Sequence, residues 1–248
     1  MIPIRDENPT LHTPLMTFLL VGMNIFVWFT VQGMGEHTAM AEALCRYALI
    51  PGDLLATSVG TIIPVGGGLA CQLDGNGQMS TIFSSMFMHG GWLHLAGNML
   101  FLWIFGDNVE DIMGPLRFAV FFALCGAAAA VAQIATDLDS TVPMVGASGA
   151  IGGVLGAYAL SFPRTRVHLF FIFTTVSVPA IFVLGYWFVL QLLSGLGSLG
   201  YEGGGVAFWA HIGGFVAGSV LVFLFRDPER IRARRAQARR HQAGHRWL

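Results

Sequence analysis

The sequence predicts an all-α polytopic membrane protein, a six-transmembrane-helix bundle with a long structured first extracytoplasmic loop. Of its 248 residues, 54% are hydrophobic and only 11% are charged, whereas soluble domains carry roughly 25% charged residues. The chain also contains six apolar stretches of about the 20 residues that are needed to cross roughly 30 Å of hydrocarbon. These stretches lie near 15–34, 92–112, 116–136, 147–162, 177–195 and 206–225.

The basic residues predict the orientation in the membrane. All 13 are arginine, and if the N-terminus is cytoplasmic, only Arg46 falls on the outer side. Because cytoplasmic loops carry an excess of basic residues, both termini are expected in the cytoplasm, with the chain in the plasma (inner) membrane. This divides the chain into a cytoplasmic N-terminal lead (1–14), a membrane domain (15–225) and an Arg-rich cytoplasmic tail (226–248). The basic tail could contact anionic lipid headgroups or nucleic acid. A solvated positive-inside anchor is the favoured interpretation, and no nucleic acid is expected as a partner.

The first span and the loop after it come next in the chain. Pro14 suits the first turn of the helix that starts at 15. The loop 35–86 is too long for a simple connection, so it is expected to have its own structure. It contains Cys45 and Cys71, for which a disulfide is possible. Its expected elements are a short helix at Met40–Leu49 and turns at 51–53, 65–68 and 74–77.

The second span carries polar side chains within an apolar segment. His94 and Asn98 are four residues apart and therefore share one helix face. An unpaired polar group in hydrocarbon costs several kcal/mol, so this face is expected to point toward other helices. His89 is expected just ahead of the helix. Glu110 lies about 18 Å along the helix from Asn98, so it is expected to tie helix ends together.

The fourth and sixth spans combine glycines with one reactive side chain each. Ser148 stands between Gly146 and Gly149 at the start of a glycine-rich helix, where free N–H groups favour negative charge. His211 shares a face with Gly214 and Gly218, three and seven residues further on. If the two small-residue stripes pack together, they bring the imidazole next to the Ser148 hydroxyl.

Two connections complete the prediction. Residues 163–176 are interpreted as a cytoplasmic connection that dips back toward the membrane before the fifth span. The loop Gly195–Gly205 contains six glycines and is expected to be mobile enough to act as a gate.

The polar residues together predict serine chemistry. A serine is a poor nucleophile until a base removes its proton, and His211 can serve as the base for Ser148. The Asn98 amide, the His94 ring N–H and the Ser148 backbone N–H can donate to an oxyanion. Taken singly, each of these residues is also explained by helix packing or by interhelical hydrogen bonds.

These residues resemble the motifs of the rhomboid intramembrane serine proteases over most of 80–225. The matching motifs are His89-x4-His94-x3-Asn98, Gly146-Ala147-Ser148-Gly149 and Ala210-His211-x2-Gly214-x3-Gly218. The resemblance implies a six-helix rhomboid-like bundle with a Ser148–His211 dyad that opens to the extracytoplasmic side. It also implies the oxyanion hole named above, support of the outer loop by His89, and no cofactor or metal. The implied substrates are transmembrane helices that enter between the second and fifth spans and are cut near small residues.

One position departs from the family pattern. Family members often carry an aromatic residue four positions after the serine, where it stacks on the imidazole, but this chain has Gly152. Trp187 or Tyr186 of the fifth span is expected to hold His211 instead. Three alternatives stay open: an inactive rhomboid-like protein that binds membrane helices, a polar-lined transporter, and a metal site built from the histidines of the motifs. The transporter would be expected to show an internal repeat, which the sequence lacks.

Overall fold

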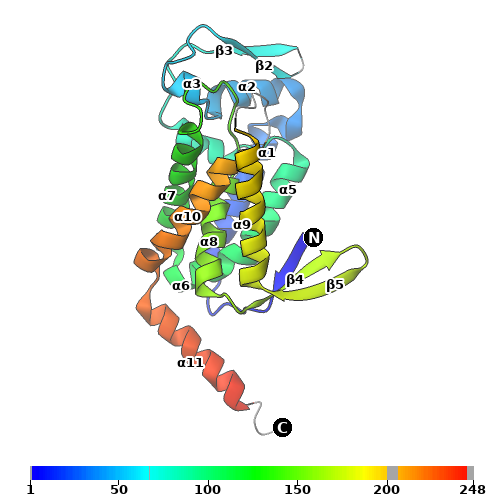
Figure 1. Cartoon of the computed structure of the whole chain (residues 1–248), viewed down its shortest axis with the longest axis vertical. Helices are drawn as coiled ribbons and strands as arrows, with labels where there is room; N and C mark the ends of the chain where they lie inside the picture. The colour runs from blue at the N-terminus through cyan, green and yellow to red at the C-terminus, as the bar shows by residue number, and fades with distance from the viewer. Residues whose placement is uncertain (1, 67, 200–205, 245–248) are drawn as a thin grey trace.

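The computed structural model of the chain describes residues 2–66, 68–199 and 206–244. A bundle of helices forms its centre, with two small sheets outside it (Figure 1). The bundle consists of α1 (Leu15–Thr30), α5 (Trp92–Phe101), the π-helical η3 (Leu102–Gly106), α6 (Asp107–Met113), α7 (Pro115–Ile134), α8 (Ser148–Ser161), α9 (Ala180–Gly197) and α10 (Phe208–Phe225).

The helices confirm the predicted class of a helical membrane protein. Within the described residues, α7, α9 and α10 are long and apolar enough to cross a membrane, and α1 and α8 are shorter apolar helices. The predicted second span falls on a continuous helical run from Trp92 to Met113. Each predicted span therefore coincides with helix, and a count of six crossings stays a prediction.

The long first loop has its own structure, as expected, and covers one end of the bundle, here called the loop end. The disulfide between Cys45 and Cys71 joins its first helix to its hairpin, with the two Cα atoms 5.6 Å apart. Ile63 and Leu73 are buried in a small core beside this disulfide. The elements are η1 (Gly33–Gly35), α2 (His37–Tyr47), α3 (Pro51–Leu54), β2 (Ile62–Gly66), β3 (Leu69–Gln72), α4 (Thr81–Ser84) and η2 (Ser85–Phe87).

The loop end also fixes the segment that leads into α8. Leu49 and Met144 exchange backbone hydrogen bonds of 3.1 and 2.7 Å. The Gly146 N–H donates to the Ser85 carbonyl over 2.9 Å. The predicted turns at 51–53 and 65–68 are the one-turn helix α3 and the hairpin turn, of which residue 67 lies outside the described residues. The loop thus holds the approach to Ser148 in place.

The opposite end of the bundle, here called the tail end, carries a sheet that the sequence analysis did not predict. β1 (Ile2–Asp6), β4 (Arg166–Phe171) and β5 (Thr174–Pro179) form an antiparallel sheet in the order β1-β4-β5. Residues 163–176 were expected to be a plain connection, but most of them belong to this hairpin (Figure 1). The pairing depends on the N-terminal lead, which lies far away in the sequence, so no local pattern reveals it.

Glu110 ties two helices together at the tail end, as predicted. Its carboxylate accepts hydrogen bonds from the backbone N–H groups of Met16 and Thr17, at 2.9 and 2.7 Å, and from the Thr17 hydroxyl at 2.8 Å. Glu110 is only 2% exposed. The first N–H groups of a helix have no intrahelical partner, so this carboxylate caps α1 from α6.

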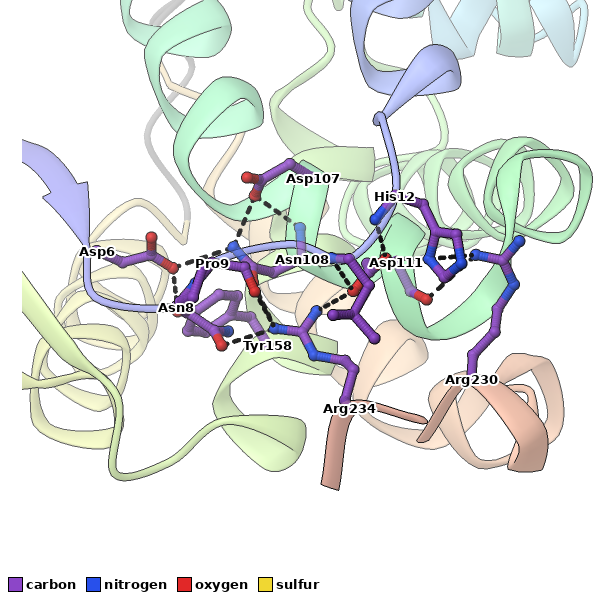
Figure 2. Close-up of polar contacts among 11 residues, drawn as sticks. Asp6, Asn8, Pro9, His12, Asp107, Asn108, Asp111, Tyr158, Arg230 and Arg234 are labelled. Carbon is purple, nitrogen blue, oxygen red and sulfur yellow. Dashed lines mark hydrogen bonds and ion pairs between the residues drawn. The ribbon is translucent and has the colours of Figure 1, made fainter. Parts of the chain in front are cut away.

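Helix α11 (Pro228–Gly244) places Arg230 and Arg234 at the tail end, as Figure 2 shows. Arg234 donates to Asp111 over 2.6 Å, to Asn8 over 2.7 Å and to Asn108 over 3.0 Å. Its side chain is only 12% exposed and that of Asp111 is fully buried. The interpretation of the whole tail as a solvated anchor is therefore wrong at Arg234. Beyond residue 237 the tail's side chains lie outside the described part of the chain.

The carboxylate of Asp6, on the N-terminal lead, lies close to the Arg234–Asp111 ion pair and contacts Asn108 as well. Asp6 accepts a hydrogen bond from the Tyr158 hydroxyl and another, 3.2 Å long, from the Asn108 amide (Figure 2). Burial raises the pKa of Asp6 above its ordinary value of 3.8. Because Tyr158 lies on α8, the lead is tied to the tail-end half of the helix that begins with Ser148.

Candidate active site

Ser148 and His211 lie side by side in the bundle. The His211 Nε2 atom is 2.8 Å from the Ser148 Oγ atom. Ser148 is the first residue of α8 and His211 lies in the first turns of α10. The backbone N–H of Ser148 therefore has no intrahelical partner and is free to donate to a ligand. The pair has the geometry of a nucleophile and its base.

Close packing of α8 against α10 creates this proximity. A Cβ atom on Gly214 would lie 1.9 Å from the Gly149 carbonyl oxygen, and one on Gly218 would lie 2.0 Å from the Gly153 oxygen. No side chain fits at such distances, so the two backbones are in direct contact. The predicted packing of the two small-residue stripes is confirmed, and it places the imidazole beside the hydroxyl.

His94 and Asn98 of α5 face Gly146, which lies two residues before Ser148. A Cβ on Gly146 would lie 2.7 Å from His94 Nε2 and 3.5 Å from Asn98 Nδ2. Gly146 has a φ angle of +122°, which residues other than glycine rarely adopt. The close approach of Gly146 thus brings two potential hydrogen-bond donors to the N-terminus of α8. Their role as an oxyanion hole stays a prediction.

His89 is fully buried and supports this donor pair. Its Nε2 atom is 2.9 Å from the Asn98 amide nitrogen, and its ring lies edge-on to that of His94 with the centroids 5.2 Å apart. Gln32, which lies just after α1, binds the His89 backbone. Its side chain accepts a hydrogen bond from the His89 N–H at 2.8 Å and donates one to the His89 carbonyl at 2.7 Å. Gln32 was not predicted as a site residue, although a glutamine just after an apolar helix was a signal.

The other side of the His211 ring is held from α9. The Trp187 ring lies 5.8 Å from the imidazole, centroid to centroid, at an angle of 34°. Tyr186, the other expected residue, is 63% exposed. The second contact was missed: the Gln191 Oε1 atom is 2.7 Å from His211 Nδ1. Gln191 stands four residues after Trp187 on the same helix face, and a polar residue in an apolar span was the available signal.

A small cavity of about 40 Å³ lies beside Ser148. About 10–15 Å³ of space measured with a water-sized probe is enough to hold one water molecule. Its walls come from the loop end, α7, α8 and α10, and include Leu49, Ser85, Met86, Ala129, Met144 and Gly146. The cavity therefore has room for water or for a small group beside Ser148.

The histidines of the site do not assemble a metal centre. Among residues 2–66, 68–199 and 206–244, no three His, Cys, Asp or Glu side chains are grouped so that they could hold a metal ion. The alternative metal site built from His89, His94 and His211 gains no support from this arrangement.

The chain is similar to known proteins of one family. The sequence profile of the Rhomboid domain matches residues 76–228, which include Ser148, His211 and the polar residues around them except Gln32. This chain therefore belongs to the rhomboid family. It is 29% identical over 84% of its length to the Rhomboid protease GluP of Bacillus subtilis. It is 25% identical over 92% of its length to Rhomboid protein 1, mitochondrial, of Saccharomyces cerevisiae, and 32% identical over 69% to RHOMBOID-like protein 5 of Arabidopsis thaliana.

These relatives are longer proteins. The aligned part of the chain covers 35% of GluP, 58% of the yeast protein and 52% of the Arabidopsis protein. The comparison thus establishes the family and the membrane domain that this chain shares with them.

Proposed function

We propose that this protein is an intramembrane serine endopeptidase that cleaves transmembrane segments of membrane proteins. The observation that carries the proposal is the 2.8 Å distance between His211 Nε2 and Ser148 Oγ inside a helical membrane bundle. Membership of the rhomboid family and the similarity to a Rhomboid protease of Bacillus subtilis support the same reaction class.

The proposed reaction begins with attack of Ser148 Oγ on the carbonyl carbon of the scissile peptide. His211 Nε2 accepts the hydroxyl proton and then gives it to the leaving amine, which leaves an acyl-enzyme. Water then attacks the acyl carbon while His211 takes a proton from it; the ester bond to Ser148 breaks, His211 returns the proton to Ser148 Oγ, and the carboxylic acid product leaves. The Ser148 N–H, the Asn98 amide and the His94 ring N–H stabilise the oxyanion in both steps.

Supporting roles follow from the contacts around this dyad. His89 orients Asn98, while Gly146 and Gly149 allow the close approaches that the site needs. Glu110 holds α1 to α6 at the tail end and stays outside the chemistry. No metal or cofactor takes part in the proposed mechanism.

The proposed substrates are transmembrane helices with a small residue at the cleavage site. A cavity of about 40 Å³ next to the nucleophile favours a small side chain there. The predicted gate loop Gly195–Gly205 starts later than expected, because residues 195–197 belong to α9, and residues 200–205 lie outside the described part of the chain. Substrate would enter between α5 and α9, past the segment that follows α9. A cross-link that joins α5 to α9 should abolish cleavage, and full activity of the cross-linked protein would argue against this entrance.

The proposed orientation places both termini in the cytoplasm and the dyad toward the opposite side. Twelve of the 13 arginines are then cytoplasmic. The Cys45–Cys71 disulfide at the loop end supports this orientation, because disulfides persist in oxidising compartments. The 1–14 lead and the 226–248 tail would accordingly flank the 15–225 membrane domain on the cytoplasmic side of the plasma membrane.

The proposal is tested by cleavage of a single-span substrate in detergent by the wild type, Ser148→Ala and His211→Ala. A serine-reactive fluorophosphonate, followed by mass spectrometry, identifies the nucleophile. Cleavage by the wild type, with label on Ser148 and loss of activity in both variants, would support the dyad. A folded wild type that neither cleaves nor becomes labelled would favour an inactive rhomboid-like protein that binds membrane helices.

A further inference from the structure

Gln191 contacts the ring nitrogen of His211 that faces away from Ser148. Its Oε1 atom lies 2.7 Å from His211 Nδ1, while His211 Nε2 lies 2.8 Å from Ser148 Oγ. A neutral imidazole carries one ring proton. If Nε2 is to accept the hydroxyl proton of Ser148, then Nδ1 must carry the ring proton and needs an acceptor. The Gln191 side-chain oxygen is that acceptor.

We propose that Gln191 is a positioning residue that fixes the tautomer and orientation of His211. The inference rests on the proposed function, since it assigns a role within the same site. When His211 takes the serine proton, both ring nitrogens become donors, and Gln191 still accepts from Nδ1. The hydrogen bond to a charged donor is stronger than that to a neutral one, so Gln191 favours the protonated imidazole that forms during attack.

The arrangement of the helices explains why this support comes from α9. A Cβ on Gly152 would lie 2.8 Å from the His211 carbonyl oxygen and 3.4 Å from the Phe215 nitrogen. An aromatic residue at Gly152 would therefore force α8 and α10 apart. The ring is accessible from α9 instead, where Trp187 covers it and Gln191 binds Nδ1.

The chemistry of an amide suits this position. A carboxylate here would place a charge within an apolar helix of the bundle, at a cost of several kcal/mol. The amide oxygen supplies a strong acceptor without that charge. The pair Trp187 and Gln191, one helical turn apart, thus performs together what a soluble protease obtains from an acidic third residue.

The test compares Gln191→Met, which keeps the length of the side chain but removes the acceptor, with Gln191→Glu, which keeps an acceptor in either protonation state. Leu193→Ala is the control on the same helix, because the Leu193 side chain is 61% exposed. Gln191→Met is expected to lower kcat about 10- to 100-fold with KM changed less than twofold. The kcat of Gln191→Glu should stay within about fivefold of the wild-type value, and the kcat of Leu193→Ala should equal the wild-type value.

The ¹⁵N chemical shifts of His211 give a readout that does not depend on turnover. We expect the Nδ1-protonated tautomer in the wild type and a mixture of tautomers in Gln191→Met. Gln191→Asn, whose amide is one methylene shorter, tests the same loss if the Met variant does not fold.

The outcomes separate the two proposals. If the wild type cleaves through Ser148 but Gln191→Met has wild-type kcat, the positioning role is wrong and the protease proposal stands. Equal losses in Gln191→Met and Gln191→Glu would show that Gln191 only packs, and an Nε2-protonated wild type would refute the tautomer. If the wild type neither cleaves nor labels at Ser148, both proposals fail together.

Discussion

Replacing Gly214 with alanine tests the claim that backbone contact between α8 and α10 brings the dyad together. The new Cβ would lie 1.9 Å from the Gly149 carbonyl oxygen, where ordinary contact begins at 3.4 Å. The two helices must therefore separate by about 1.5 Å, since neither atom belongs to a flexible side chain. The same movement would stretch the 2.8 Å contact between Ser148 and His211 beyond hydrogen-bond distance.

The expected result is a loss of about 100-fold in kcat, because a displacement of about 1 Å between reacting groups costs about that much. The assay is cleavage of the single-span substrate, with the rate of fluorophosphonate labelling as a second measure. Gly22→Ala and Gly185→Ala are matched controls, because no atom lies within 4 Å of the Cβ position at either glycine. Wild-type cleavage by a folded Gly214→Ala variant would refute the argument.

Four further predictions follow from single contacts. Gly146→Ala should lower the labelling rate about 10-fold or more, because its Cβ would lie 2.7 Å from His94 Nε2 at a φ angle of +122°; an unchanged rate would contradict the close approach. Glu110→Ala should lower the free energy of unfolding by about 2–4 kcal/mol, measured by thermal or denaturant unfolding, since buried N–H groups at the start of α1 lose their acceptor. Cys45→Ser should destabilise the loop end by about 3 kcal/mol, because the disulfide closes a loop of 26 residues; limited proteolysis of the first loop should then become faster, and protection equal to the wild type would count against it. Burial raises the pKa of Asp6, so its contribution to stability is present below pH 3.8 and is lost as the pH rises through the raised value; Asp6→Asn should therefore lessen the fall in Tm between pH 3.8 and the raised pKa, and parallel Tm profiles would exclude this role.

Local features of the sequence accounted for much of the site. His94 and Asn98 were placed on one face by helical spacing alone. The glycines around Ser148 and after His211 indicated two flat surfaces, and flat surfaces in membrane helices favour close contact. These inferences succeed because each needs only the period of one helix and the thickness of the bilayer.

Contacts between distant elements could not be predicted in this way. Gln191 is apparent as a polar residue in an apolar span, but its contact with His211 depends on how α9 is rotated against α10. Gln32 binds the His89 backbone across 57 residues, and β1 pairs with β4 across more than 160 residues. Arg234 looked like one of many basic tail residues, although the structure docks it onto Asp111.

The sequence by itself determined that this is a helical membrane protein, which polar residues form the candidate site, and that Glu110 lies away from them. Composition, run length and helical period are properties of single segments, so the sequence carries them directly. Only the tertiary structure decided the pairing of Cys45 with Cys71, the sheet at the tail end and the support of His211 by Gln191. Each of these depends on the rotation and offset of packed elements, which many side chains set jointly.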